Sequence, residues 1–296
     1  MPNGILLLDK PQGLTSNGAL QRVRKAFGAA SAGHVGTLDP MATGMLPICL
    51  DEATKVIAEI ESGTKAYEFT LRLGARTDTG DSEGDVVEAL AVPALDSAAI
   101  EAVLARFRGR QQQVPPMYSA LKRNGRPLYE LARQGIEVDR PPRAIEIHRL
   151  ALVEQAPDLL RLECECAKGT YIRVLGEDLA RALGTVGHLS ALRRTWVQPF
   201  RGMPMCTLDT ALDPNCRAEA LLPPDTALAA LPQARLTADE CRALVHGQAV
   251  RSATTPPVEV GRRVRVYSPE GVFLGLAEAR PDGWLQPRRL LRISAT

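Results

Sequence analysis

The chain has 296 residues, of which 45% are hydrophobic and 24% charged, and its formal net charge is +2. These values are typical of a globular protein with a sizeable core, and the length predicts about two domains. No apolar run reaches the roughly eighteen residues that a membrane span needs, and no basic leader precedes a hydrophobic segment. We therefore expect a cytoplasmic protein without a membrane segment, and a monomer, since no long apolar seam is evident.

Six cysteines stand at positions 49, 164, 166, 206, 216 and 241, and none forms a C-x-x-C pair. The four histidines are scattered, so the spacing fits neither a zinc site nor a disulfide framework. Residues 235–296 contain ten arginines and no lysine against six acidic residues. A basic carboxy-terminal segment indicates a polyanionic partner.

The amino-terminal region predicts a buried strand at residues 4–8, followed by a break at residues 10–13. Thr15 or Ser16 can then cap a helix whose apolar face carries Leu20, Val23 and Phe27.

Residues 33–44, with the sequence GHVGTLDPMATG, hold one carboxylate, one imidazole, three glycines and a proline. Pro40 biases Asp39 toward an extended backbone, so we expect a stiff loop that presents Asp39. An ordinary turn is the simpler alternative, because Asp-Pro pairs and glycines mark turns in many proteins.

The next segments predict a strand at residues 47–50, a short helix starting at Thr54, and a strand at residues 65–73. Apolar and polar residues alternate along the last of these, with Tyr67 at one end of the apolar row. Periodicity alone favours a core role for Tyr67. The acidic stretch 78–85 lacks the ligand and glycine positions of a calcium loop and predicts a solvated hairpin connection. Ser97 can cap the following helix.

Residues 106–143 are rich in arginine and proline, which predicts a basic insertion. Strands are expected at residues 144–150, 160–167 and 188–195, with a helix before the last that ends at Gly184. Arg173 falls at the amino end of that helix, where the backbone dipole disfavours a cation unless an anion partners it. A proline- and alanine-rich connection, residues 213–235, leads to a helix at 236–246 and short strands at 263–267, 272–277 and 284–285.

The segment Gly33 to Leu50 resembles the catalytic motif of the TruB family of pseudouridine synthases, and the resemblance extends to residues 8–16, 65–67, 168–173 and 188–195. It implies an α+β pseudouridine synthase fold over residues 1–235, with a mixed or antiparallel central sheet flanked by helices. It further implies an RNA-gripping insertion at about 106–143 and a small PUA-like β-barrel at 236–296.

The resemblance also implies roles for individual residues. Asp39 would be the catalytic acid, acting as nucleophile or base, and Arg173 would pair with it. Tyr67 and Leu192 would hold the flipped uracil between them, and Tyr171 would contact the same nucleotide. His34 would lie near the vacated stack, and we also assign Lys10 to substrate binding.

The implied reaction is the isomerisation of uridine 55 in the T arm of tRNA. It neither adds nor removes atoms, so no cofactor and no metal is expected. The sequence contains no phosphate-binding, dinucleotide, serine-hydrolase or zinc-protease motif. Two alternatives stay open, namely a non-catalytic tRNA-folding protein and a guide-RNA-dependent synthase.

Overall fold

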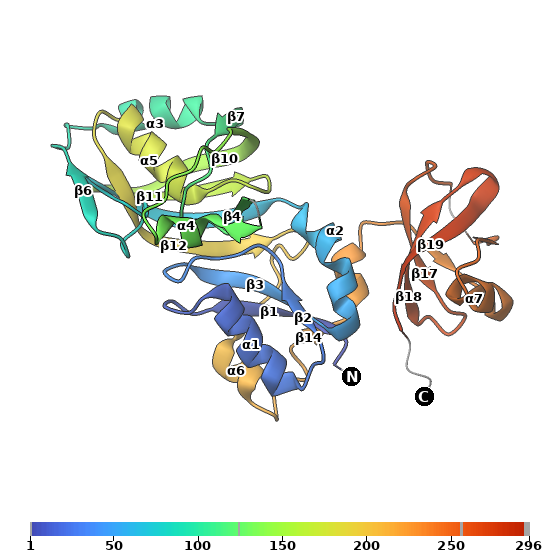
Figure 1. Ribbon diagram of the computed structural model, residues 1–296. Coiled ribbons are helices and arrows are strands. Elements are labelled where there is room, and N and C mark those ends of the chain that lie inside the picture. The colour runs from blue at the N-terminus through green and yellow to red at the C-terminus, as the bar shows by residue number, and fades with distance from the viewer. Residues whose placement is uncertain (1, 124, 255–256, 293–296) are drawn as a thin grey trace.

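The computed structural model describes residues 2–123, 125–254 and 257–292. Figure 1 shows a larger body built on one sheet and a smaller sheet, coloured red, beside α7 at the end of the chain. Strands of the larger sheet are β1 (Gly4–Lys10), β2 (Ala32–His34), β3 (Thr43–Leu50), β4 (Lys65–Leu73), β7 (Gly109–Gln113), β10 (Arg143–Ala156), β11 (Leu159–Cys166), β12 (Gly187–Val197), β13 (Cys206–Thr207) and β14 (Leu221–Leu222). Those of the smaller sheet are β15 (Gln233–Arg235), β16 (Val250–Arg251), β17 (Arg263–Tyr267), β18 (Phe273–Ala279) and β19 (Trp284–Leu290).

The remaining elements are two short hairpins, the helices and three 3₁₀ turns. The hairpins are β5 (Ala75–Thr77) with β6 (Val86–Ala89), and β8 (Lys122–Arg123) with β9 (Arg126–Pro127). The helices are α1 (Ser16–Phe27), α2 (Ile57–Glu61), α3 (Ser97–Arg106), α4 (Leu128–Ala132), α5 (Ile172–Ala182), α6 (Leu208–Leu212) and α7 (Ala238–Val245). The 3₁₀ turns are η1 (Asp51–Val56), η2 (Pro224–Leu228) and η3 (Pro281–Gly283). No helix among the described residues is long and apolar enough to cross a membrane.

The larger sheet runs in the order β13-β1-β3-β12-β4-β11-β10-β7, with β14 beside β1 and β2 beside β3. Its β1–β13 and β3–β12 pairs are parallel and the others antiparallel, so the predicted α+β class with a mixed sheet is confirmed. The parallel contact of β3 with β12 joins the two halves of the chain at the centre of the sheet. Strand β4 has the predicted bounds and the predicted alternation of buried and more exposed residues.

Alternation along β1 shows how the sheet separates two cores. Leu6 and Leu8 pack into one cluster with residues of α1, α3, α5 and α6, whereas Ile5 and Leu7 pack into another with η1 and α2. Side chains of successive strand residues point to opposite faces, so a continuous apolar run is buried on both sides. The second cluster also includes Leu276 of β18, which ties the smaller sheet to this face.

Two helix starts differ from the sequence prediction. The segment from Asp51 to Val56 forms the 3₁₀ turn η1, in which the Thr54 hydroxyl bonds to the Asp51 carbonyl, and α2 begins only at Ile57. Asp96, not Ser97, caps α3, because the Asp96 carboxylate accepts the amide hydrogen of Ala99 at 2.7 Å. Of the two residues expected to cap α1, Thr15 does so and Ser16 is the first helical residue.

Two boundaries also shift. Strand β7 pairs with β10, so residues 109–113 belong to the sheet and the insertion proper spans residues 114–142. The expected connection 213–235 contains β14, η2 and β15, and β15 pairs with β17 in the smaller sheet. We therefore propose a domain boundary near Pro232 instead of residue 235. The smaller sheet runs in the order β15-β17-β18-β19-β16.

Candidate active site

The loop between β2 and β3 carries Asp39 and is fastened on both sides. On one side, the Ser16 hydroxyl donates to the Leu38 carbonyl at 2.9 Å and accepts from the Leu38 amide at 2.8 Å. On the other, the Pro40 carbonyl accepts from the Gly13 amide at 2.8 Å. These bonds, together with the fixed φ of Pro40, restrict where the Asp39 carboxylate can point.

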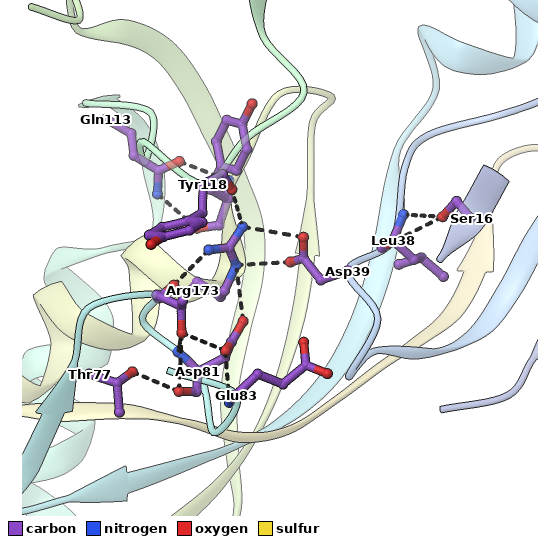
Figure 2. A network of polar contacts seen from close by, with 11 residues as sticks. Ser16, Leu38, Asp39, Thr77, Asp81, Glu83, Gln113, Tyr118 and Arg173 are labelled. Atoms are coloured by element: carbon purple, nitrogen blue, oxygen red, sulfur yellow. Dashed lines mark hydrogen bonds and ion pairs between the residues drawn. The ribbon is translucent and has the colours of Figure 1, made fainter. Parts of the chain in front are cut away.

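Arg173, in the first turn of α5, meets this carboxylate directly. Its Nε lies 2.8 Å from Asp39 Oδ2, and its Nη2 lies 3.3 Å from Oδ1, so both carboxylate oxygens are engaged. The side chain of Arg173 is 5% exposed, whereas that of Asp39 is 34% exposed. Figure 2 shows the two groups facing each other from separate parts of the fold. The buried cation therefore orients an acid that still faces open space.

Three more groups hold the Arg173 guanidinium. The carbonyls of Thr79 and Tyr118 accept from Nη1 and Nη2, each at 2.6 Å, and Asp81 Oδ2 lies 3.7 Å from Nε (Figure 2). The sequence predicted a solvated connection between β5 and β6, but Asp81 within it is only 4% exposed. The connection turns inward because Asp81 packs beside the cation.

A cavity of about 730 Å³ opens beside Asp39. Its lining includes five of the seven residues that the sequence singled out, namely Asp39, Tyr67, Tyr171, Arg173 and Leu192. These residues come from four different segments, and the fold brings them together. A cavity of this size with a few convergent polar groups is typical of a small-molecule or nucleotide site.

Tyr67 and Leu192 lie on the neighbouring strands β4 and β12, near the cavity wall. The buried side chain of Arg194 stands directly opposite Tyr67 in the sheet, and burial raises the pKa of Tyr67 to about 12. Tyr67 is therefore neutral across the physiological range. Arg194 donates to the carbonyls of Met45, Val35 and Gly36, and so supports the loop that leads to Asp39.

Tyr171 is the N-cap residue of α5, directly before Ile172. Its backbone amide donates to Gln113 Oε1 at 2.8 Å, and its carbonyl accepts from Gln113 Nε2 at 3.1 Å. Burial raises the pKa of the Tyr171 hydroxyl. The phenol lines the cavity two residues before the arginine that binds Asp39.

Lys10 and His34 do not line this cavity. Lys10 is fully buried, and its Nζ donates to the carbonyls of Pro11, Leu14 and Pro40 at 2.9, 2.6 and 3.3 Å. We therefore propose that Lys10 supports the Asp39 loop, instead of binding substrate as was expected from the sequence. His34 lies on β2, half-buried, with a lowered pKa caused by burial and the nearby Arg194 cation.

The cavity also carries cations that sequence reasoning did not single out. Lys65, Arg143, Lys168 and Arg194 line it together with Glu61. Lys65 and Arg194 are buried, so Arg143 and Lys168 are the exposed cations of the lining that suit a phosphodiester. Burial lowers the pKa of Lys65. Among the described residues no cluster of three or more metal-ligating side chains occurs.

Of the missed residues, Arg194 had a signal in the sequence, whereas Gln113 and Asp81 did not. Arg194 stands two positions after Leu192 on a predicted strand, so both had to face the same side. Gln113 ends a run of three glutamines, and nothing in that run distinguished the buried one. Asp81 lay in a stretch whose many acids suggested solvent exposure.

Family comparisons cover almost the whole chain. Residues 24–172 match the family described as "TruB family pseudouridylate synthase (N terminal domain)". Residues 173–229 match "tRNA pseudouridylate synthase B C-terminal domain", and residues 232–291 match "Pseudouridine synthase II TruB, C-terminal".

Individual relatives are similar over nearly their full lengths. The chain is 48% identical to "tRNA pseudouridine synthase B" of Dechloromonas aromatica (strain RCB) over 295 residues, covering 99% of this chain and 96% of that protein. It is 47% identical to the protein of the same name from Chromohalobacter salexigens, covering 99% and 95%.

Solved structures share the fold. The chain in "Crystal Structure of a Cbf5-Nop10-Gar1 Complex" superimposes with a TM-score of 0.72 at 24% identity, covering 95% of this chain and 80% of that one. The chain in "Structure of H/ACA RNP bound to a substrate RNA containing 2'-deoxyuridine" gives 0.74 at 21% identity, with coverage of 99% and 86%.

Proposed function

The chain belongs to the TruB family of pseudouridylate synthases, and we propose that it isomerises uridine 55 in the T loop of tRNA to pseudouridine. The observation that carries this proposal is the ion pair between the buried Arg173 and the partly exposed Asp39 at the edge of the cavity. The relatives from Dechloromonas and Chromohalobacter are both named as tRNA enzymes, which supports tRNA as the substrate.

The target nucleotide has to leave its stack to reach Asp39. Extrusion of a base costs a few kcal/mol, and less in a loop than in a duplex. Tyr67 and Leu192 on adjacent strands supply a flat aromatic ring and an aliphatic group for the uracil, and Tyr171 closes the cavity from α5. The exposed Arg143 and Lys168 of the lining would neutralise the phosphates on either side of the flipped nucleotide.

The reaction breaks the bond from ribose C1′ to uracil N1 and joins C1′ to C5. The C5 proton leaves, and N1 gains a proton, so the product has the same atoms as the substrate. Asp39 either attacks C1′ or removes the 2′ proton to give a glycal, and its position beside the cavity suits both. In each case the detached uracil has to rotate so that C5 faces C1′, while the side chains that line the cavity hold it in place.

Arg173 would keep the carboxylate of Asp39 aimed through these steps. Its guanidinium also contacts Asp81 and two carbonyls, so its position is fixed before substrate arrives. Pre-organised charge of this kind avoids reorganisation during the reaction.

The first test replaces Asp39 with asparagine and supplies unmodified tRNA transcript, without guide RNA or other proteins. We expect Asp39→Asn to bind the transcript with an affinity within about threefold of the parent and to form no pseudouridine, because the amide can neither attack C1′ nor accept the 2′ proton. Mapping of modified positions by chemical labelling and primer extension reads out both the activity and the site.

Asp85→Asn is the matched control, because Asp85 is an exposed aspartate outside the cavity. Substantial turnover by Asp39→Asn would refute the role of Asp39. A parent protein that binds tRNA without modifying it would favour the folding-protein alternative, and activity only with an added guide RNA would favour the guided synthase.

A further inference from the structure

Gln113 stands where the insertion leaves the sheet, at the last position of β7. It is 5% exposed, and both polar atoms of its side chain bond to one residue, Tyr171, through the backbone amide and carbonyl. A side-chain amide bound in this way imitates the peptide group of a neighbouring strand. Figure 2 shows the Gln113 side chain with a hydrogen bond drawn from each of its polar atoms.

The bond from the Tyr171 amide to Gln113 compensates in part for the side-chain cap that α5 lacks. Tyr171 is the N-cap residue of α5, with an extended backbone at φ −96° and ψ 109°, and its own side chain makes no capping bond. An uncapped helix start leaves amide groups without partners and frays easily. Gln113 satisfies one of these groups and fixes the backbone that directs the Tyr171 ring into the cavity.

The same short segment is tied to α5 a second time. Five residues after Gln113, the Tyr118 carbonyl accepts from Arg173 Nη2 at 2.6 Å. Residues 113–118 therefore hold the start of α5 at two points, the backbone of Tyr171 and the side chain of Arg173. This segment is also the root of the basic insertion, residues 114–142.

We propose that Gln113 is a positioning residue that couples the root of the insertion to Tyr171 and to the Arg173–Asp39 pair. When the insertion binds RNA, residues 113–118 at its root would carry the change in its position to Tyr171 and Arg173, which surround the flipped nucleotide. Gln113 does not touch substrate and acts only through Tyr171 and Arg173. The proposal rests on the proposed synthase activity for its kinetic consequences, but its structural content stands apart from that activity.

The neighbouring glutamine provides a matched control. Gln112 lies on the same strand but is exposed, and it makes no side-chain hydrogen bond among the described residues. Methionine resembles glutamine in length but offers neither hydrogen bond. Gln113→Met removes both contacts to Tyr171, whereas Gln112→Met changes an equally long side chain in solvent.

The kinetic experiment measures single-turnover pseudouridine formation with enzyme in saturating excess, alongside tRNA affinity and the thermal unfolding midpoint. We expect Gln113→Met to lower the saturated rate at least about tenfold, corresponding to ~1.4 kcal/mol, with affinity changed less than about threefold. Gln112→Met should match the parent. A normal saturated rate, or a loss confined to affinity or to thermal stability, would overturn the proposal.

A double-mutant cycle separates positioning from general loosening. If Gln113 acts through Arg173, Gln113→Met should lower the saturated rate much less in an Arg173→Lys background than in the parent. The lysine has already removed the contacts through which Gln113 acts. Fully additive losses would contradict the coupling.

A crystal structure of Gln113→Met decides the structural part even if the parent proves inactive on tRNA. We expect the Tyr171 backbone to move and the Arg173 Nε to Asp39 Oδ2 distance to lengthen from 2.8 Å. An unchanged start of α5 would refute the inference, whereas an inactive parent with a displaced α5 would refute only the proposed function.

Discussion

Arg173 performs a task that only an arginine can perform. Its planar fork reaches two oxygens of Asp39 and two backbone carbonyls at the same time. A lysine carries the same charge but places three donors on one atom, so it cannot span these acceptors. The geometry of the fork, and not charge alone, sets the direction of the acid.

We therefore predict that Arg173→Lys lowers the saturated rate of pseudouridine formation by about 10²-fold, because a misplaced catalytic group of this kind costs that much. Affinity for tRNA should change little, since the side chain is buried. Single-turnover kinetics with a binding assay would check both. Arg181→Lys, at the exposed end of α5, is the control, and a near-parental rate for Arg173→Lys would contradict the prediction.

Lys10 gives a prediction about pH. Burial lowers its pKa from 10.5 to about 8, so the folded protein binds this proton less tightly than the unfolded chain does. The contribution of Lys10 to stability should then rise as the pH rises from about 8 toward 10.5 and stay flat below that window.

Urea unfolding of the parent and of Lys10→Met across this pH range would test the prediction. Methionine does not titrate, so the difference in unfolding free energy between the two proteins isolates the lysine. A difference that shrinks as the pH rises through the window would show that burial does not penalise the charged amine.

At the scale of elements, the start of β3 shows why a glycine is required beside the site. Gly44 has φ +97°, and a Cβ there would lie 2.2 Å from the Arg194 carbonyl oxygen of β12. Gly109 has a similar φ of +89° but open space around it. An alanine would therefore meet backbone strain at both positions, and a close contact with a neighbouring strand only at Gly44.

We predict that Gly44→Ala destabilises the fold by at least about 2 kcal/mol more than Gly109→Ala, because it adds a backbone clash to a strain of ~1–3 kcal/mol. Chemical denaturation of both variants measures this difference. Equal losses would mean that β3 and β12 can separate without cost.

Regular elements were largely predictable from the sequence because their signals are local. The alternation of Tyr67, Phe69 and Leu71 fixed β4, and Thr15 fixed the start of α1. The Asp39–Arg173 pair joins residues 134 positions apart, and its prediction came from family resemblance. The inward turn at Asp81 and the burial of Lys10 depend on packing between distant segments, which no local pattern reports.

At the scale of the whole molecule, the smaller sheet presents exposed arginines. Arg251, Arg262 and Arg289 are exposed and have no ion-pair partner among the described residues, whereas Arg288 pairs with Glu278 at 2.9 Å. Unpaired surface arginines are suited to phosphate contacts, because no acid competes for them.

We predict that replacing these three arginines with glutamine weakens tRNA binding at least about tenfold at moderate salt and reduces the salt dependence of binding. The saturated single-turnover rate should stay within about twofold of the parent. Filter binding at several salt concentrations checks this. Arg288→Gln is the control, and unchanged affinity in the triple variant would remove the case for RNA contact by this sheet.

The contacts between the two sheets fix their separation. Lys55 Nζ donates to the Leu290 carbonyl at 2.7 Å, the Arg292 amide donates to Glu52 at 2.5 Å, and Leu276 packs into the core beneath β1. Because these contacts anchor the smaller sheet to the larger body, the distance between the active-site cavity and the exposed arginines of the smaller sheet is fixed. An RNA that contacts both surfaces has to span that distance. Lengthening its stem between the two contact points by a few base pairs should therefore break the contact with the smaller sheet while leaving the reaction at the loop intact.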